Sequence, residues 1–132
     1  MKRAMFVGRW QPVDLGHQQI VNKKLNKGIP VLLCVCDAPP DELHPFTTSQ
    51  TMHMLEVAFE GQDVVVQSIP DVESINYSKE LGVDINGHKT SGRAKSVSIS
   101  EIRTQIKEGT SDWKELVYPR VQGIVHSILL RN

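Results

Sequence analysis

The stretch Gly8-Arg9-Trp10-Gln11-Pro12-Val13-Asp14-Leu15-Gly16-His17 decides the fold, because it joins a predicted strand to a predicted helix. The four residues before it, Ala4 to Val7, are all apolar, which indicates a buried strand. After it, apolar residues recur at helical spacing over about residues 17–27. A helix that begins directly after a strand presents free N–H groups and the positive end of its dipole, and both attract phosphate. This loop is therefore the first candidate for a functional site.

The rest of the chain alternates predicted strands with predicted helices, read from apolar runs and capping residues. Strands are predicted at residues 31–36, 63–69 and, more weakly, 83–85, and helices are predicted to begin at Thr47, Ser98 and Pro119. This order predicts an α/β fold, a Rossmann-like doubly wound parallel sheet with helices on both faces, in a single domain over residues 1–132. In such sheets, ligands bind at the carboxyl ends of the strands.

Charge and composition exclude several classes of protein. Lys plus Arg and Asp plus Glu each count 15, so the formal net charge is zero, which argues against bulk nucleic-acid binding. No apolar run approaches the length of a membrane span, so we expect no membrane partner and a cytoplasmic location. Cys34 and Cys36 are expected as small buried side chains, and no His, Cys or carboxylate spacing indicates a resident metal.

A second stretch also suits phosphate. Residues 97–103 read Val-Ser-Ile-Ser-Glu-Ile-Arg, which predicts a capped helix start with two hydroxyls and, one turn in, the guanidinium of Arg103. Hydroxyls, free N–H groups and a guanidinium together can bind a polyphosphate. Taken alone, this stretch is more often an ordinary capping box, and Gly16-His17 is more often an ordinary turn. The two become informative when they occur together and in this order.

Together the two stretches resemble the nucleotidyltransferase superfamily with the His-x-Gly-His signature, which includes nicotinamide mononucleotide adenylyltransferases and glycerol-phosphate cytidylyltransferases. The adenylyltransferase opening Gly-Arg-Phe-Gln-Pro-x-His-x-Gly-His is matched by Gly8, Arg9, Gln11, Pro12, Gly16 and His17, with Trp10 in place of Phe. Residues 97–103 match the second signature, Ile-Ser-x-Thr-x-Ile-Arg. The resemblance runs along nearly the whole chain and is greatest to compact versions carried by bacteriophages.

The resemblance implies transfer of a nucleoside monophosphate, with ATP as the expected donor, to a phosphorylated small-molecule acceptor. Pyrophosphate would leave, and Mg²⁺ would accompany the ATP. The implied catalytic residues are His17, Asp14 and Arg103. The implied nucleotide-binding residues are Gly8, Arg9, Trp10, Gln11, Gly16, His17, Ser98, Ile99, Ser100 and Arg103. The implied acceptor-binding residues are Phe46, Asp71, Asn76 and Tyr77. The resemblance also allows a homo-oligomer.

Asp14 departs from the family pattern, because it occupies the position of the first signature His. A carboxylate there repels phosphate unless it is protonated or bridged by a metal ion. Three interpretations stay open: an engineered inactivation, a natural change that uses the metal, or a binding protein that has lost catalysis. A cytidylyltransferase for a small alcohol phosphate is a further alternative, which the short chain favours and the opening motif does not.

Overall fold

The computed structural model describes residues 2–11, 13–88, 99–115 and 117–131. The strands are β1 (Ala4–Gly8), β2 (Val31–Asp37) and β3 (Val64–Pro70). The α-helices are α1 (Leu15–Leu25), α2 (Thr48–Ala58), α3 (Ile99–Glu108) and α4 (Gln122–Arg131). Single turns of 3-10 helix lie at η1 (Lys79–Leu81), η3 (Asp112–Glu115) and η4 (Pro119–Val121). Among the described helices, none is both long and apolar enough to cross a membrane.

The three strands form a parallel sheet in the order β1-β2-β3. Gly8 at the end of β1 pairs with Val35 near the end of β2, and Val35 pairs with Ser68 on β3, so the carboxyl ends of the strands share one edge of the sheet. Parallel strands joined by helices make an α/β, Rossmann-like fold, as predicted. The edge at which the strands end is where the functional site is sought.

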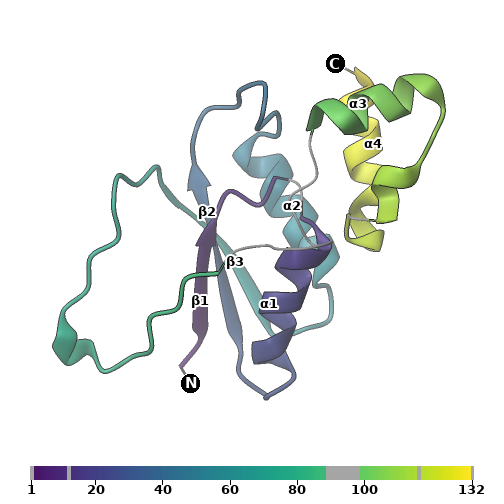
Figure 1. Ribbon diagram of the computed structural model, residues 1–132. Coiled ribbons are helices and arrows are strands. Elements are labelled where there is room, and N and C mark those ends of the chain that lie inside the picture. Colours follow the sequence, from purple (N-terminus) through teal and green to yellow (C-terminus); the bar gives the residue numbers. More distant parts are fainter. Residues whose placement is uncertain (1, 12, 89–98, 116, 132) are drawn as a thin grey trace.

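Helices α1 and α2 lie on the same side of the sheet (Figure 1). Two successive right-handed crossovers that proceed in one direction along a sheet place their helices on one face. The core lies between them and the sheet, where Leu33, Met54 and Leu55 are fully buried. α3 and α4 pack against each other and join the same core through Ile102 and Val125.

The second face of the sheet is more open than the apolar strand sequences suggested. Met5 on β1 is 61% exposed and Val65 on β3 is 43% exposed. These two side chains, with Leu32 between them in the register, lie on the face opposite α1 and α2. The predicted burial of β1 therefore holds for the face that carries Phe6, whereas within the described ranges no helix packs over Met5.

Two other sequence predictions need correction. The predicted strand at Val83 to Ile85 is wrong: residues 71–88 form an exposed segment whose one regular element is the turn η1. Among the described residues, no strand lies beside Val83 to Ile85 to complete a hydrogen-bonded ladder, and apolar character alone does not make a strand. Helix α1 begins at Leu15, two residues before the predicted start, because Asp14 caps it. The predicted cap at Ser98 lies outside the described residues.

Candidate functional site

The first loop, defined here as residues 9–14, runs from the carboxyl end of β1 to α1 and ends in a capping box. The Oδ1 atom of Asp14 accepts a hydrogen bond from the backbone N–H of His17 at 3.0 Å. In return, the backbone N–H of Asp14 donates to Nδ1 of His17 at 3.2 Å. His17 therefore lies in the first turn of α1, at the edge where β1 ends, and two hydrogen bonds join it to Asp14.

The carboxyl group of Asp14 is almost fully buried, with 1% of its surface exposed. Its second oxygen, Oδ2, is buried and has no hydrogen-bond partner among the described residues. Burial raises the pKa of Asp14, an effect only partly opposed by the charge of His17 and by the backbone N–H groups of His17 and Gly16. The group therefore carries a negative charge less readily than a surface aspartate, which reduces the repulsion expected for phosphate.

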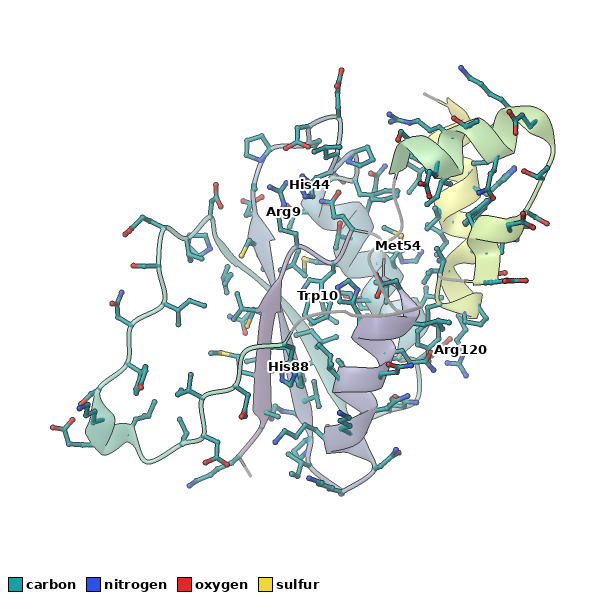
Figure 2. All side chains as sticks on the ribbon, viewed as in Figure 1. Arg9, Trp10, His44, Met54, His88 and Arg120 are labelled. Carbon is teal, nitrogen blue, oxygen red and sulfur yellow. The ribbon has the colours of Figure 1, made fainter. Side chains whose placement is uncertain are left out.

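Trp10 lies beneath the first loop and not on its surface (Figure 2). It is 4% exposed, and its indole Nε1–H donates to the carbonyl of Cys34 on β2 at 3.0 Å. Its ring centroid lies 4.9 Å from that of His17, at an interplanar angle of 59°. The backbone of Trp10 adopts a φ of 57°, in the left-handed region that costs energy for a bulky residue. Trp10 thus supports the imidazole from below, and its predicted nucleotide contact stays a prediction.

Gly8 is needed because the Trp10 ring approaches the end of β1 closely. A Cβ added at Gly8 would lie 3.3 Å from Cε2 of the indole, which is tighter than ordinary van der Waals contact. The indole is held by its bond to Cys34 and has little room to move away. The glycine predicted for the nucleotide site is therefore explained first by packing against Trp10.

Gln11 ties the first loop to the segment before α2. Its side-chain Nε2 donates to the carbonyl of Phe46 at 3.0 Å, and its Oε1 accepts the backbone N–H of Phe46 at 3.1 Å. The side chain of Phe46 is fully buried in the core. Gln11 therefore acts as a strut between two loops at the carboxyl edge, a role that the sequence pattern does not indicate.

The four residues predicted to bind the acceptor are not brought together. Phe46 is buried, whereas Asp71, Asn76 and Tyr77 lie on the exposed segment 71–88, which extends away from the sheet and helices (Figure 1). Asn76 donates to Ser74 Oγ at 3.0 Å within that segment. Their proposed role in acceptor binding stays a prediction.

Two arginines supply positive charge. Nη2 of Arg9 and Nε of Arg103 are both buried, and neither has a hydrogen-bond partner among the described residues. Arg9 lies above the carboxyl ends of the strands, and α3, which carries Arg103, begins on the same side of the sheet (Figures 1 and 2). A buried guanidinium nitrogen without a partner is costly, and an anionic ligand can satisfy it.

The second predicted phosphate stretch is described only from Ile99 onward. Ile99 and Ser100 open α3, and Arg103 follows one turn later, as predicted. Thr104 Oγ1 donates to the carbonyl of Ser100 at 3.0 Å. Ser98, like Pro12 in the first loop, lies outside the described residues. A helix start, the hydroxyl-bearing Ser100 and the guanidinium of Arg103 thus occur within one turn of each other.

The tail of the chain holds the first loop in place, a relationship that sequence reasoning missed. Asp14 forms an isolated antiparallel bridge with Val117, and the N–H of Tyr118 donates to the carbonyl of Val13 at 3.1 Å. Val117 is fully buried and Pro119 opens the following turn, η4. The sequence predicted a helix start at Pro119, which says nothing about the partner of the residues before it.

The described residues contain no group of three His, Cys, Asp or Glu side chains that could hold a metal ion. Nδ1 of His44 pairs with Asp41 Oδ1 at 3.0 Å. His88 stacks on Phe6, with ring centroids 5.9 Å apart.

Comparison with known proteins gives relatives that align over nearly the whole chain and others that align over part of it. No protein-family profile matches the chain. A nicotinamide-nucleotide adenylyltransferase of Pyrobaculum aerophilum is 29% identical over 160 aligned positions, covering 97% of this chain and 89% of the relative. A second, from Aeropyrum pernix, is 24% identical over 97% of this chain and 92% of its own length. A third, from Methanococcus maripaludis, is 32% identical over 58% of this chain and 45% of its own length. These similarities support a nucleotidyltransferase.

Proposed function

We propose that this nucleotidyltransferase moves the adenylyl group of ATP to a phosphorylated small-molecule acceptor, with release of pyrophosphate. The observation that carries the proposal is the first loop, in which a strand end, a helix start and His17 meet above the buried Trp10. The relatives named nicotinamide-nucleotide adenylyltransferase favour ATP over CTP and a nucleotide-like acceptor. Nicotinamide mononucleotide is therefore the acceptor to test first.

The proposed reaction is a substitution at the α-phosphorus of ATP. A phosphate oxygen of the acceptor forms a bond to that phosphorus, and the bond to the bridging oxygen of the β-phosphate breaks. The bonding electron pair leaves with pyrophosphate, so no redox partner or covalent enzyme intermediate is required. Because negative charge builds up on the α-phosphoryl oxygens and on the leaving group, catalysis rests on positioning and on donors aimed at those oxygens.

The residues of the site divide this work. His17 would donate to an α-phosphoryl oxygen, and Arg103 with the N–H groups at the start of α3 would hold the leaving pyrophosphate. Arg9, whose Nη2 is buried without a described partner, would neutralise a further phosphate charge. Gln11 and Trp10 would keep the first loop in the shape that these contacts need.

Magnesium fits the proposal as a companion of ATP and not as a resident ion. The described residues offer no cluster of three ligands, and Mg²⁺ is commonly bound through substrate phosphates with few protein ligands. Bound in that way, the ion would neutralise phosphate charge. No step assigned to the protein side chains depends on it.

The test is pyrophosphate release, measured with Mg²⁺ over a grid of ATP and CTP against phosphorylated acceptors. The chain and its Asp14→His variant are assayed side by side. The proposal expects release that requires both ATP and an acceptor. Release with CTP and an alcohol phosphate would instead identify a cytidylyltransferase, and silence of both proteins across the grid would overturn the proposal.

A second candidate function rests on Asp14. A buried carboxyl group without a partner for Oδ2 stands where the family has a phosphate donor, and losing one such donor costs roughly 100- to 1,000-fold in rate. This observation favours a nucleotide-binding protein with impaired turnover. Binding of ATP without pyrophosphate release, together with release by Asp14→His, would identify that function.

A further inference from the structure

The capping box at the start of α1 determines which nitrogen of His17 carries a hydrogen. The backbone N–H of Asp14 points to Nδ1 of His17 at 3.2 Å, so Nδ1 serves as the acceptor. A neutral imidazole has one donor nitrogen and one acceptor nitrogen. When Nδ1 accepts, the hydrogen resides on Nε2. In most capping boxes the third residue is Glu or Gln, and here it is an imidazole with two distinguishable nitrogens.

We propose that Asp14 is a positioning residue that grips His17 at two atoms and keeps the hydrogen on Nε2, so that the imidazole serves as a donor to phosphate. The inference rests on the proposed function for its purpose, because it concerns the donor of that reaction. Asp14 then does not replace the missing His as a phosphate ligand. Its role is instead to fix the orientation and the tautomer of His17.

The carboxyl group of Asp14 can also accept a hydrogen from Nδ1 of His17. The protonation state of Asp14 therefore affects which nitrogen of the imidazole carries the hydrogen. Oδ1 of Asp14 lies 3.3 Å from Nδ1 of His17, close enough to receive a hydrogen from it. Oδ1 already accepts the N–H of His17, whereas the buried Oδ2 has no partner among the described residues. When Oδ2 carries a proton, the carboxyl group is neutral and no longer favours a hydrogen on Nδ1. A proton transferred from Asp14 to Nδ1 gives an imidazolium, which also carries hydrogen on Nε2. Both arrangements with one shared proton therefore retain the Nε2 donor.

The ring of His17 is also held against rotation. The indole of Trp10 packs 4.9 Å away, and the indole is itself fixed by its bond to Cys34. Turning the imidazole to exchange its nitrogens would break the contact between Nδ1 and the N–H of Asp14. Packing against Trp10 and the hydrogen bond to Nδ1 thus favour the same orientation of the imidazole. A hydrogen bond to one ring nitrogen commonly fixes the orientation and tautomer of a functional His.

The direct test is nitrogen NMR of the full ¹⁵N-labelled chain at neutral pH, with the His17 signals identified by their loss in His17→Gln. The correlations between ring nitrogens and ring protons show which nitrogen is protonated. The inference expects hydrogen on Nε2. A neutral ring with hydrogen on Nδ1 and a bare Nε2 would overturn it. The measurement needs no turnover. A wrong tautomer would therefore overturn this inference alone, whereas an inactive protein would overturn the proposed function.

Two variants test the role of the Asp14 side chain. Asp14→Ala removes the cap on the His17 N–H, so the first turn of α1 no longer holds the backbone N–H of residue 14 against Nδ1. It should therefore mix the two tautomers of His17 and lower kcat by about tenfold or more, with a smaller change in KM for ATP. Asp14→Asn keeps an acceptor at the cap, so it should restore the single tautomer and recover most of the kcat lost in Asp14→Ala. If Asp14→Ala keeps the pure Nε2–H tautomer, the side chain has no positioning role.

The matched control removes the same kind of cap from another helix. Thr47 caps α2 through Oγ1, which accepts the N–H of Gln50 at 3.1 Å, with a reciprocal bond of 2.9 Å. Thr47→Ala should reduce stability as Asp14→Ala does, but leave the His17 tautomer and kcat unchanged. If Thr47→Ala changed both readouts equally, the effect of Asp14→Ala would be general loosening, and the inference would fail.

Discussion

Asp14 and His17 hold each other through two reciprocal hydrogen bonds, 3.0 Å from the His17 N–H to Asp14 Oδ1 and 3.2 Å from the Asp14 N–H to His17 Nδ1. Each residue of this pair therefore helps to hold the other in place at the start of α1. Asp14 starts the helix, loses most of its contact with water and fixes the neighbouring imidazole.

The buried carboxyl group should make stability depend on pH. Because burial raises the pKa of Asp14, the folded protein binds more protons there than the unfolded chain between the ordinary aspartate pKa of about 3.9 and the raised folded value. The contribution of Asp14 to the free energy of unfolding therefore falls as pH rises through that window, and is constant below and above it. Asp14→Asn lacks this titration, so it should gain stability relative to the parent chain between acidic and neutral pH. Urea unfolding of both proteins measures the difference, and a difference independent of pH would contradict the assignment.

The side-chain hydrogen bonds of Gln11, which join the first loop to the segment before α2, should contribute measurably to the free energy of unfolding. Gln11→Leu removes two hydrogen bonds to the backbone of Phe46 and leaves that N–H and carbonyl without these partners, so the free energy of unfolding should fall by about 1–3 kcal/mol. The KM for ATP should rise because the loop is less fixed. The control is Gln19→Leu, an exposed position on α1 that should change stability by less than about 0.5 kcal/mol. Equal effects of the two substitutions would show that the hydrogen bonds of Gln11 to Phe46 contribute no particular stability.

The sequence predicted the three strands well, because the runs in β1, β2 and β3 are apolar and short, and it predicted the cap at Thr47 from residue types alone. It did not predict that Asp14 is a helix cap, because the family pattern marks that position for a phosphate ligand. Nor did it show that Trp10 lies under the loop, since that placement depends on the carbonyl of Cys34, 24 residues away. Contacts between distant segments leave no local pattern.

The hydrogen bond of Trp10 can be separated from its bulk. Trp10→Phe loses the bond to the carbonyl of Cys34 and should lower the free energy of unfolding by about 1–3 kcal/mol beyond the loss of packing. Trp113 is a matched control, because it is 2% exposed and its Nε1 has no hydrogen-bond partner among the described residues. Trp113→Phe removes similar volume and no such bond. The account therefore requires chemical denaturation to find Trp10→Phe the more destabilising of the two.

Arg103 should matter for ATP affinity more than for folding. No described residue pairs with its buried Nε, so Arg103→Ala breaks no hydrogen bond of that atom in the folded chain. Losing a charged hydrogen bond to phosphate costs about 1.5–3 kcal/mol, which corresponds to roughly a 10- to 100-fold weaker Kd for ATP. Calorimetric titration measures this change.

Arg120→Ala serves as the control for Arg103→Ala. The Arg120 guanidinium bonds to the carbonyl of Glu60, and Figure 2 shows Arg120 far from the carboxyl edge where Arg9 lies. Its removal should lower stability slightly and leave the Kd for ATP unchanged. An unchanged Kd for Arg103→Ala would remove the second phosphate stretch from the site.

The most direct test of adenylyl transfer follows two labels in ATP, with nicotinamide mononucleotide as acceptor and Mg²⁺ present. One sample carries the label at the α-phosphorus and the other at the γ-phosphorus. The account predicts that the α-label appears in the product joined to the acceptor and that the γ-label appears only in pyrophosphate. Transfer of the γ-label to the acceptor would mean a phosphotransferase, and would contradict the proposed reaction.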